Sequence, residues 1–301
     1  MNKVFSAILE YNVKNEDSGK TAEQILKREF NISSGLFKEL KMSGKIMINN
    51  IPCRSIDKVK FKDVVSADIE ENKYSDIPEY IKEPEVLFED AHIMVVNKPA
   101  ELSVHPCIGD YEKTLAGSVI YHWRKNGEEH NFHAINRLDK DTSGICVIAK
   151  NRYSHGILSG QLYSAEKEYV AIVHGRIDKS GIIDKPIKRA KESIIKRIVD
   201  EGGKNAVTVY SPIEVTDNYT VVRIKLLTGR THQIRVHFSH IGHPLFGDWL
   251  YGNGDCEKQL IGRQALAANK IRFHHPVSGE LLEFSVEMPE DMKMLLAKLK
   301  N

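Results

Sequence analysis

Short apolar runs of strand length, separated by turn-forming residues, recur along most of this sequence and limit the folds open to it. Residues 93–96 and 145–149 are two such runs, and both are rich in β-branched side chains. Helical patterns beyond residue 86 are few: only residues 115–123 and 155–163 are predicted as helices, and the rest as short strands. Strands thus outnumber helices without regular alternation. This pattern predicts an α+β fold with a mixed, mostly antiparallel sheet rather than a doubly wound parallel sheet.

Length and composition are those of an ordinary globular protein with about two domains. The net charge is +2, so any surface that attracts nucleic acid has to be local. Four scattered cysteines form no Cys-x-x-Cys pair, which fits free thiols in a reducing cytoplasm. No apolar run approaches the roughly 18 residues that span a bilayer, and the short N-terminal run is not a signal peptide. We therefore expect a cytoplasmic protein without a membrane partner.

The N-terminal part has its own pattern of elements. A short strand is predicted at residues 4–9, a helix from Thr21, and a second helix capped by Ser33 or Ser34. Gly44 ends that helix, and residues 45–50 form a strand that runs into an Asn-Asn turn. A last strand at residues 64–69 closes the unit.

Basic residues are concentrated in this part of the chain. Between residues 20 and 62 only four acids oppose ten bases: Lys20, Lys27, Arg28, Lys38, Lys41, Lys45, Arg54, Lys58, Lys60 and Lys62. Such a cluster indicates either phosphate binding or a solvated helix face. The order of elements resembles the S4 RNA-binding domain, a small α/β unit, which implies that Lys38, Lys41 and Lys45 contact RNA. We predict an S4-like domain at residues 1–75, an acidic, proline-bearing linker at 76–85, and a second domain at 86–301.

Residues 133–150 most clearly indicate a functional site. Here a charged, turn-prone segment that contains Arg137 and Asp139 comes before the strand at 145–149. The segment is either a polar turn in which these two side chains pair, or a loop that carries chemistry. The sequence Arg-Leu-Asp-x-x-Thr-Ser-Gly at 137–144 resembles the signature loop of the RluA family of pseudouridine synthases. The resemblance implies that Asp139 is the catalytic carboxylate and that Arg137 displaces the target base, although Asn136 stands where many members have histidine.

Further segments extend the resemblance over about residues 84–288. Asn97-Lys98-Pro99 and Ser103-Val104-His105-Pro106 match the family, with Glu101 where glycine is usual. Tyr169 lies on a predicted strand at 166–173, where its pattern alone suggests half-buried packing. The resemblance instead implies that Tyr169 stacks on the target ring and removes the C5 proton.

The segment Leu-Thr-Gly-Arg-Thr-His-Gln-Ile-Arg-Val-His at 227–237 contains the remaining site residues. Its histidines raise the question of a metal, but no helix face unites them, and residues five apart on a strand point to opposite faces. We therefore predict no metal site. The family resemblance implies that Arg235 pairs with Asp139, whereas Arg230 and His232 face RNA. Segments 242–248, 263–266 and 273–276 complete the match.

The resemblance implies an isomerase that converts uridine in structured RNA to pseudouridine and uses no cofactor. Two routes are open to Asp139: attack on a ring carbon or removal of a sugar proton. Ribosomal RNA is the favoured partner because of the S4-like domain, with transfer RNA open, and we expect a monomer. Two other classes were considered: a glycosidase-like hydrolase that uses Asp139 and Asp141, and a non-catalytic RNA-binding assembly factor. The spacing of the two aspartates speaks against the first. The presence of Asp139, Tyr169 and Arg235 speaks against the second.

Overall fold

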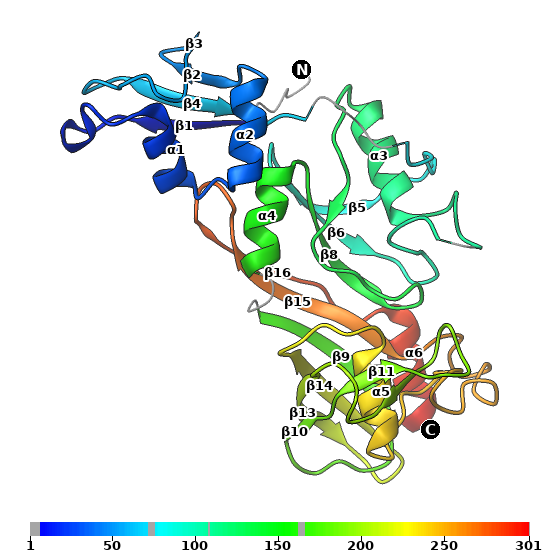
Figure 1. Ribbon diagram of the computed structural model, residues 1–301. Coiled ribbons are helices and arrows are strands. Elements are labelled where there is room, and N and C mark those ends of the chain that lie inside the picture. Colours follow the sequence, from blue (N-terminus) through cyan, green and yellow to red (C-terminus); the bar gives the residue numbers. More distant parts are fainter. Residues whose placement is uncertain (1–6, 72–75, 108, 162–165, 301) are drawn as a thin grey trace.

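The computed structural model describes residues 7–71, 76–107, 109–161 and 166–300, and it confirms the α+β class. One large sheet runs through the molecule in the order β10-β13-β14-β9-β15-β8-β6-β5, with β16 beside β15 and β7 beside β8. Every described strand pair in it is antiparallel except β15 with β8. A separate small sheet lies at the N-terminal end (Figure 1).

The N-terminal module, residues 7–69, contains the two helices and the strands near residues 46 and 64 that its pattern predicts. Its elements are β1 (Ile8–Asn12), α1 (Ala22–Phe30), α2 (Ser34–Met42), β2 (Ile46–Ile48), β3 (Ile51–Pro52) and β4 (Val64–Asp68), and its sheet order is β1-β4-β2-β3. Thr21 starts α1 through a capping box with Gln24, and the Ser33 side chain caps α2. Residues 4–6 of the predicted first strand lie outside the described residues. The strand in this region begins at Ile8.

The module rests on a helix of the larger unit, α4 (Arg152–Gln161), and Figure 1 shows α2 and α4 next to each other. Tyr153 is buried in the hydrophobic core of the module, and its hydroxyl donates to the carbonyl of Phe30 at 3.0 Å. Arg152 forms an ion pair with Glu39 at 3.0 Å, and the Arg152 backbone N–H donates to Glu71. These contacts attach the module to the larger unit through the first turn of α4.

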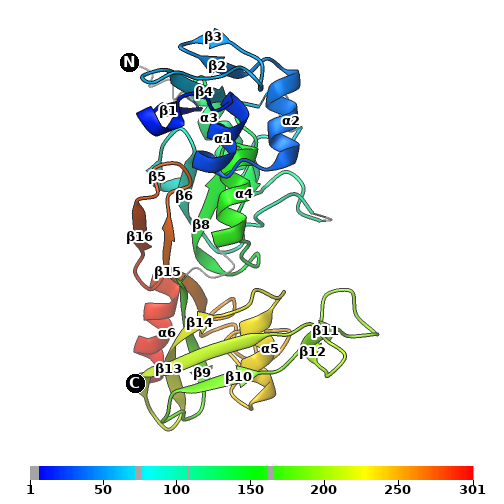
Figure 2. The ribbon, with the colours of Figure 1, turned by 60° about the vertical axis from the view of Figure 1, so that its left-hand side comes forward.

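The larger unit contains the remaining elements. Its strands are β5 (Glu85–Glu89), β6 (Ile93–Lys98), β7 (His133–Ala134), β8 (Ser143–Ala149), β9 (Glu166–His174), β10 (Gly181–Asp184), β13 (Val207–Val215), β14 (Tyr219–Leu226), β15 (Leu266–His274) and β16 (Leu281–Ser285). Its other helices are α3 (Leu115–Lys125), α5 (Gln233–His240) and α6 (Glu290–Lys300). A hairpin of β11 (Ile187–Arg189) and β12 (Arg197–Val199) projects from the part that carries α5 (Figure 2).

Two helices correct the sequence prediction, which assigned short strands to residues 233–240 and 290–300. In α5, residues 233–238 are all buried, so the segment lacks the alternation of exposed and buried residues that reveals a helix. In α6 the signal was present, because Met292 and Leu295 are buried at helical spacing. The predicted helix at 155–163 is confirmed in part: α4 begins earlier, at Arg152, and residues 162–163 lie outside the described residues.

The meeting of β8 and β15 fixes the position of the loop that precedes β8. Gly144 has φ +116°, and a Cβ atom there would lie 2.1 Å from the carbonyl oxygen of Ala268. Only glycine permits this close parallel contact. The glycine that ends the Arg-Leu-Asp-x-x-Thr-Ser-Gly segment therefore sets where the loop enters the sheet. Among the described residues, no helix combines the length and the apolar character that a bilayer crossing requires.

Candidate active site

A cleft of about 730 Å³ brings together six of the nine predicted site residues. Its walls come from the loop before β8, from strand β9 and from the loop that leads into α5. The six residues are Arg137, Asp139, Tyr169, Arg230, His232 and Arg235. The other three, Lys38, Lys41 and Lys45, are on the N-terminal module and do not line the cleft.

The loop that carries Asp139 is held from behind by buried polar side chains. The Thr142 backbone N–H donates to the Asp139 carbonyl at 3.0 Å, which closes a turn. The Arg263 guanidinium donates to the Asp141 carbonyl, and the Gln264 amide donates to the Thr142 hydroxyl. Sequence reasoning noted residues 263–266 only as a family match. Their supporting role depends on the pairing of β15 with β8, which brings them behind the loop.

Lys98 supports the same loop and was not among the predicted site residues. Its buried ammonium group donates to the carbonyls of Pro99, Leu102 and Lys140, the last at 2.9 Å. Burial lowers the pKa of Lys98 to about 8, although the three carbonyl acceptors favour the ammonium form. Lys98 thus ties the end of β6 to the residue that follows Asp139.

Asp139 lies beside two basic side chains, and its side chain is 28% exposed. The Nη1 atom of Arg235 is 3.4 Å from Asp139 Oδ2, as the family resemblance implied. The shorter contacts of Arg235 are with Asp248, whose two oxygens accept from Nε at 2.7 Å and from Nη2 at 2.8 Å. Asp248 therefore holds the guanidinium and leaves Nη1 free to face Asp139.

The charge of this guanidinium is secured by its surroundings. Burial favours the neutral form of Arg235, but the bonds and the charge of Asp248 outweigh it and raise the pKa of Arg235 above its ordinary value. Asp248 is itself fully buried and accepts from the backbone N–H groups of Leu250 and Tyr251. A fixed positive group is thus placed beside Asp139.

His232 is the second basic side chain near Asp139, and its Nε2 lies 3.9 Å from Asp139 Oδ2. It occupies the N-cap of α5 in the left-handed region, with φ +58°. Burial lowers the pKa of His232, and the positive charges of Arg235 and Arg197 act in the same direction, against Asp139. His232 is therefore a neutral imidazole at neutral pH.

Tyr169 is a wall of the cleft and belongs to β9. Its side chain is almost wholly buried. Burial raises the pKa of Tyr169, and the negative charge of Asp139 adds to this effect. The hydroxyl consequently keeps its proton at neutral pH.

Two arginines reach the cleft from opposite loops. Arg137 is exposed, whereas Arg230 is partly buried and donates from Nε to the carbonyl of Asn205 at 2.8 Å. The buried amide of Gln233 holds the Arg230 loop, because its oxygen accepts from the Thr228 hydroxyl and from the Arg230 backbone N–H. Arg137 is thus the more exposed of the two.

Two positions that depart from the family pattern are accommodated locally. The Asn136 amide donates to the carbonyl of Ile145 and accepts from the backbone N–H of Val147, so it pairs with β8 as a short piece of backbone would. Glu101 has φ +62°, so the turn keeps a conformation suited to glycine.

His232, His237 and His243 have hydrogen-bonding partners in the protein. His237 Nδ1 contacts the Thr208 hydroxyl, and His243 Nδ1 contacts the carbonyl of His174. The strand geometry used above to separate these histidines was wrong, because residues 233–240 form helix α5. Within the described part of the chain, no group of three or more His, Cys, Asp or Glu side chains is placed to hold a metal ion.

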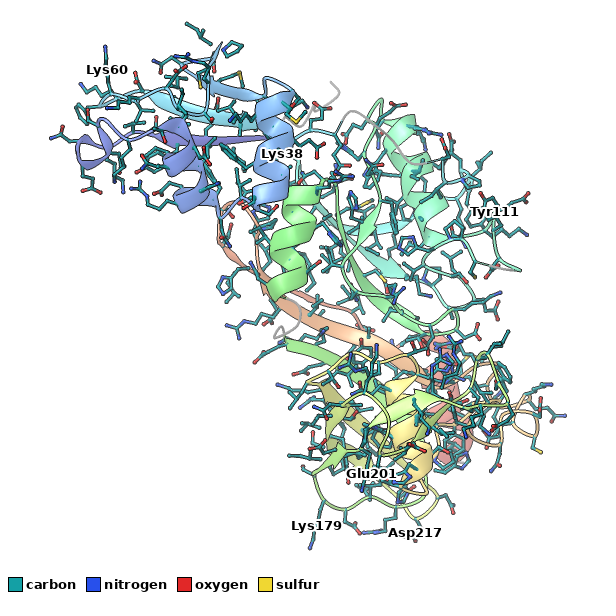
Figure 3. All side chains as sticks on the ribbon, in the orientation of Figure 1. Lys38, Lys60, Tyr111, Lys179, Glu201 and Asp217 are labelled. Carbon is teal, nitrogen blue, oxygen red and sulfur yellow. The ribbon has the colours of Figure 1, made fainter. Side chains whose placement is uncertain are left out.

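The three predicted lysines of the N-terminal module differ in their surroundings. Lys38 and Lys41 are exposed on α2, and Figure 3 shows Lys38 on that helix. Lys45 forms an ion pair with Asp68 at 3.3 Å and donates to the carbonyl of Glu70. Only Lys38 and Lys41 of this set are exposed.

Known proteins share both the sequence and the fold. Residues 92–240 match a family model described as RNA pseudouridylate synthase. The chain is 38% identical to the Bacillus subtilis RNA pseudouridine synthase YhcT, with 95% of this chain and 96% of that protein covered. It is 36% identical to ribosomal large subunit pseudouridine synthase D of Vibrio cholerae, with 97% and 95% covered. The fold resembles that of human RNA pseudouridylate synthase domain containing 1, with a TM-score of 0.57, 24% identity, and 74% and 97% of the two chains covered.

Proposed function

The chain belongs to the RluA family of RNA pseudouridine synthases, and from this premise we propose that Asp139 is its catalytic carboxylate. As a member of this family the protein is an isomerase that converts uridine in RNA to pseudouridine. One observation supports the assignment of Asp139 above others: its carboxylate is in the cleft, beside Arg235 and within the same walls as Tyr169. The hydrolase alternative is disfavoured by the family assignment.

The isomerisation needs a group that starts the reaction, a positive charge beside that group, and a side chain that helps the uridine leave its stack. The bond between N1 and C1′ breaks, the uracil turns, C5 joins C1′, and one proton leaves C5 while another is gained at N1. Asp139 starts the reaction by attack on a ring carbon or by removal of a sugar proton. Arg235 stabilises the ionised carboxylate and fixes its rotamer. The uridine first leaves its stack, and exposed Arg137 offsets part of that cost of a few kcal/mol.

Tyr169 stacks on the uracil and transfers the C5 proton. Since its raised pKa keeps the hydroxyl protonated, it acts as a base only when it gives up its own proton as it receives another. Asp139 lines the same cleft as Tyr169, and it is the acceptor we propose for that proton. The isomerisation needs no cofactor, because it involves no net oxidation or group transfer.

We propose ribosomal RNA as the substrate and the cytoplasm as the site of action. Support comes from the similar Vibrio cholerae protein, whose name specifies the ribosomal large subunit, and from cysteines that are free at all four positions. The test is to map pseudouridine in total RNA from a deletion strain and from the same strain with the gene restored. Loss and recovery at a ribosomal position supports the proposal. Loss confined to transfer RNA would overturn it.

The N-terminal module, proposed as a separate S4-like domain within residues 1–75, supplies phosphate contacts through Lys38 and Lys41. Both lysines are exposed on one helix. Each phosphate contact contributes roughly 0.7–0.9 to the slope of log affinity against log salt concentration. Replacing both lysines by glutamine should therefore lower the slope by roughly 1.4–1.8 and leave the single-turnover rate at saturating RNA within about threefold.

Point substitutions suit this test better than removal of the module, because Tyr153 and Arg152 of α4 would lose their partners. A matched control replaces Lys179 and Lys185, which are exposed on the larger unit, by glutamine; Figure 3 shows Lys179 at the end of the molecule opposite the module. An equal change of slope in both double variants would refute a specific role for the module. Sedimentation of the free enzyme tests the expected monomer.

A further inference from the structure

Tyr251 contacts both side chains that face Asp139, although the isomerisation as described gives it no part. Its hydroxyl is 2.9 Å from Nδ1 of His232, and its ring lies 5.1 Å from the guanidinium carbon of Arg235. The same hydroxyl accepts a hydrogen bond from the backbone N–H of Arg197 at 2.9 Å. Tyr251 is held in turn by its own backbone N–H, which donates to Asp248.

The donors around this hydroxyl favour one position for the imidazole proton of His232. A tyrosine hydroxyl has one proton to donate and can also accept. The backbone N–H of Arg197 can only donate, so it occupies an acceptor position of the hydroxyl. The hydroxyl proton then goes to Nδ1 of His232, the other partner that the described residues place within reach. With Nδ1 as acceptor, the imidazole proton is on Nε2, the nitrogen that faces Asp139.

We propose that Tyr251 is a positioning residue for the isomerisation: its hydroxyl holds His232 in the Nε2–H form and its ring holds Arg235. The proposal rests on the assignment of Asp139 made above. Oδ2 of Asp139 then faces two N–H donors, a neutral one from His232 and a charged one from Arg235. The distance of 3.9 Å is long for a hydrogen bond, as is common before a substrate closes a site.

The hairpin of β11 and β12 is the outer support of this arrangement. Arg197 begins β12, and its backbone N–H is the group that orients the Tyr251 hydroxyl. Figure 2 shows the hairpin projecting from the part of the molecule that carries α5. Through Tyr251, the position of this surface hairpin affects His232 and Arg235, the two neighbours of Asp139.

The first test compares Tyr251→Phe with wild-type enzyme. The substitution keeps the ring over Arg235 and removes only the hydroxyl. Long-range ¹H–¹⁵N correlation spectra report which nitrogen of His232 is protonated, and loss of the signal in His232→Asn assigns it. Asparagine suits this control because it tolerates the left-handed backbone at position 232. We expect the Nε2–H form in wild type and a mixture of tautomers in Tyr251→Phe.

The single-turnover rate should depend on which nitrogen of His232 carries the proton. The single-turnover rate of Tyr251→Phe should fall about fivefold to tenfold, the value of one neutral hydrogen bond, with RNA affinity unchanged within about twofold. Tyr219→Phe is the matched control, because its buried hydroxyl also has a side-chain partner, Glu214, outside the cleft. It should leave the rate and the His232 spectrum unchanged. An unaltered tautomer in Tyr251→Phe, or an equal loss of rate in Tyr219→Phe, would overturn the proposal.

A double-variant cycle separates action through His232 from a general structural role. If the Tyr251 hydroxyl acts through His232, Tyr251→Phe should lower the rate of His232→Asn by no more than about twofold. A further fivefold loss in that background would refute the link. The spectrum is recorded without RNA, so it reports the tautomer of His232 whether or not Asp139 takes part in the chemistry. Turnover retained by Asp139→Asn alongside the tautomer change would refute the function assigned to Asp139 and leave the hold of Tyr251 on His232 intact.

Discussion

Replacing Asp248 by asparagine should destabilise the enzyme far more than the same change at Asp291. Both carboxylates bind a buried arginine through two contacts: Asp248 holds Arg235 at 2.7 and 2.8 Å, and Asp291 holds Arg263 at 2.7 and 2.9 Å. They differ in burial, because the side chain of Asp248 is 0% exposed and that of Asp291 is 44% exposed. The pair of substitutions therefore isolates the effect of burial on an otherwise similar bidentate bridge.

The predicted loss of stability depends on the hydrogen-bond partners that each arginine retains after the substitution. In Asp248→Asn one guanidinium N–H faces an NH₂ donor, and Arg235 becomes a buried charge without a full partner. Breaking a buried pair in this way costs about 3–5 kcal/mol of unfolding free energy. Arg263 retains three carbonyl acceptors and the Ser143 hydroxyl, and the pair it loses is half-exposed, so Asp291→Asn should cost about 1 kcal/mol or less.

Scanning calorimetry at pH 7 measures the difference. Asp248→Asn should lower the Tm of the larger unit by about 6–20 °C, and Asp291→Asn by no more than about 4 °C. The single-turnover rate of Asp248→Asn should also fall by about 100-fold, because Arg235 is no longer aimed at Asp139. Equal shifts of Tm in the two variants would refute the argument that burial of the Arg235–Asp248 bridge supports the site.

Three further predictions address the turn, the tyrosine and the buried lysine. Glu101→Gly should raise the unfolding free energy by about 0.5–1 kcal/mol, because it relieves a left-handed backbone at φ +62°; a destabilised variant in urea titration would contradict this. Tyr169→Phe should bind RNA normally but lose about 100-fold in single-turnover rate, with a larger loss in Tyr169→Leu; equal, mild defects would reduce Tyr169 to a packing role. Burial lowers the folded-state pKa of Lys98 to about 8, below its unfolded value, so the folded state releases this proton first and stability should rise with pH above about 8. Lys98→Met should lack this rise in denaturation curves between pH 8 and 10, and an identical slope in both proteins would exclude Lys98 as its source.

The sequence predicted the residues of the cleft better than it predicted what orients them. Arg137 and Asp139 lie in a turn-prone polar segment, but their roles and that of Arg235 were inferred from the resemblance of short local motifs to a family. The hold of Asp248 on Arg235 could not be predicted, because it depends on the geometry of α5 and the loop that follows. That helix was missed because residues 233–238 alternate polar and apolar side chains as a strand does, although all six are buried in the helix.

The support behind the loop was hidden for a related reason. Lys98 and Arg263 are charged side chains in segments that read as a strand end and a turn, and such residues are expected at the surface. They are buried because β6, β8 and β15 converge behind the loop, where backbone carbonyls satisfy their donors. The burial of these two side chains can be recognised only when the long-range pairing of the strands is known. In the N-terminal module, by contrast, caps and turns at Thr21, Ser33 and Asn49 are local signals, and the elements there were predicted well.

The assignment of Asp139 as the catalytic carboxylate is tested most directly by single-turnover isomerisation with purified Asp139→Asn enzyme at saturating RNA. The substitution is nearly isosteric and removes only the ionised group. We expect RNA affinity within about threefold of wild type and a rate at least about 1,000-fold lower. Turnover within about tenfold of wild type, with RNA still bound, would show that another group performs the chemistry and would contradict the account.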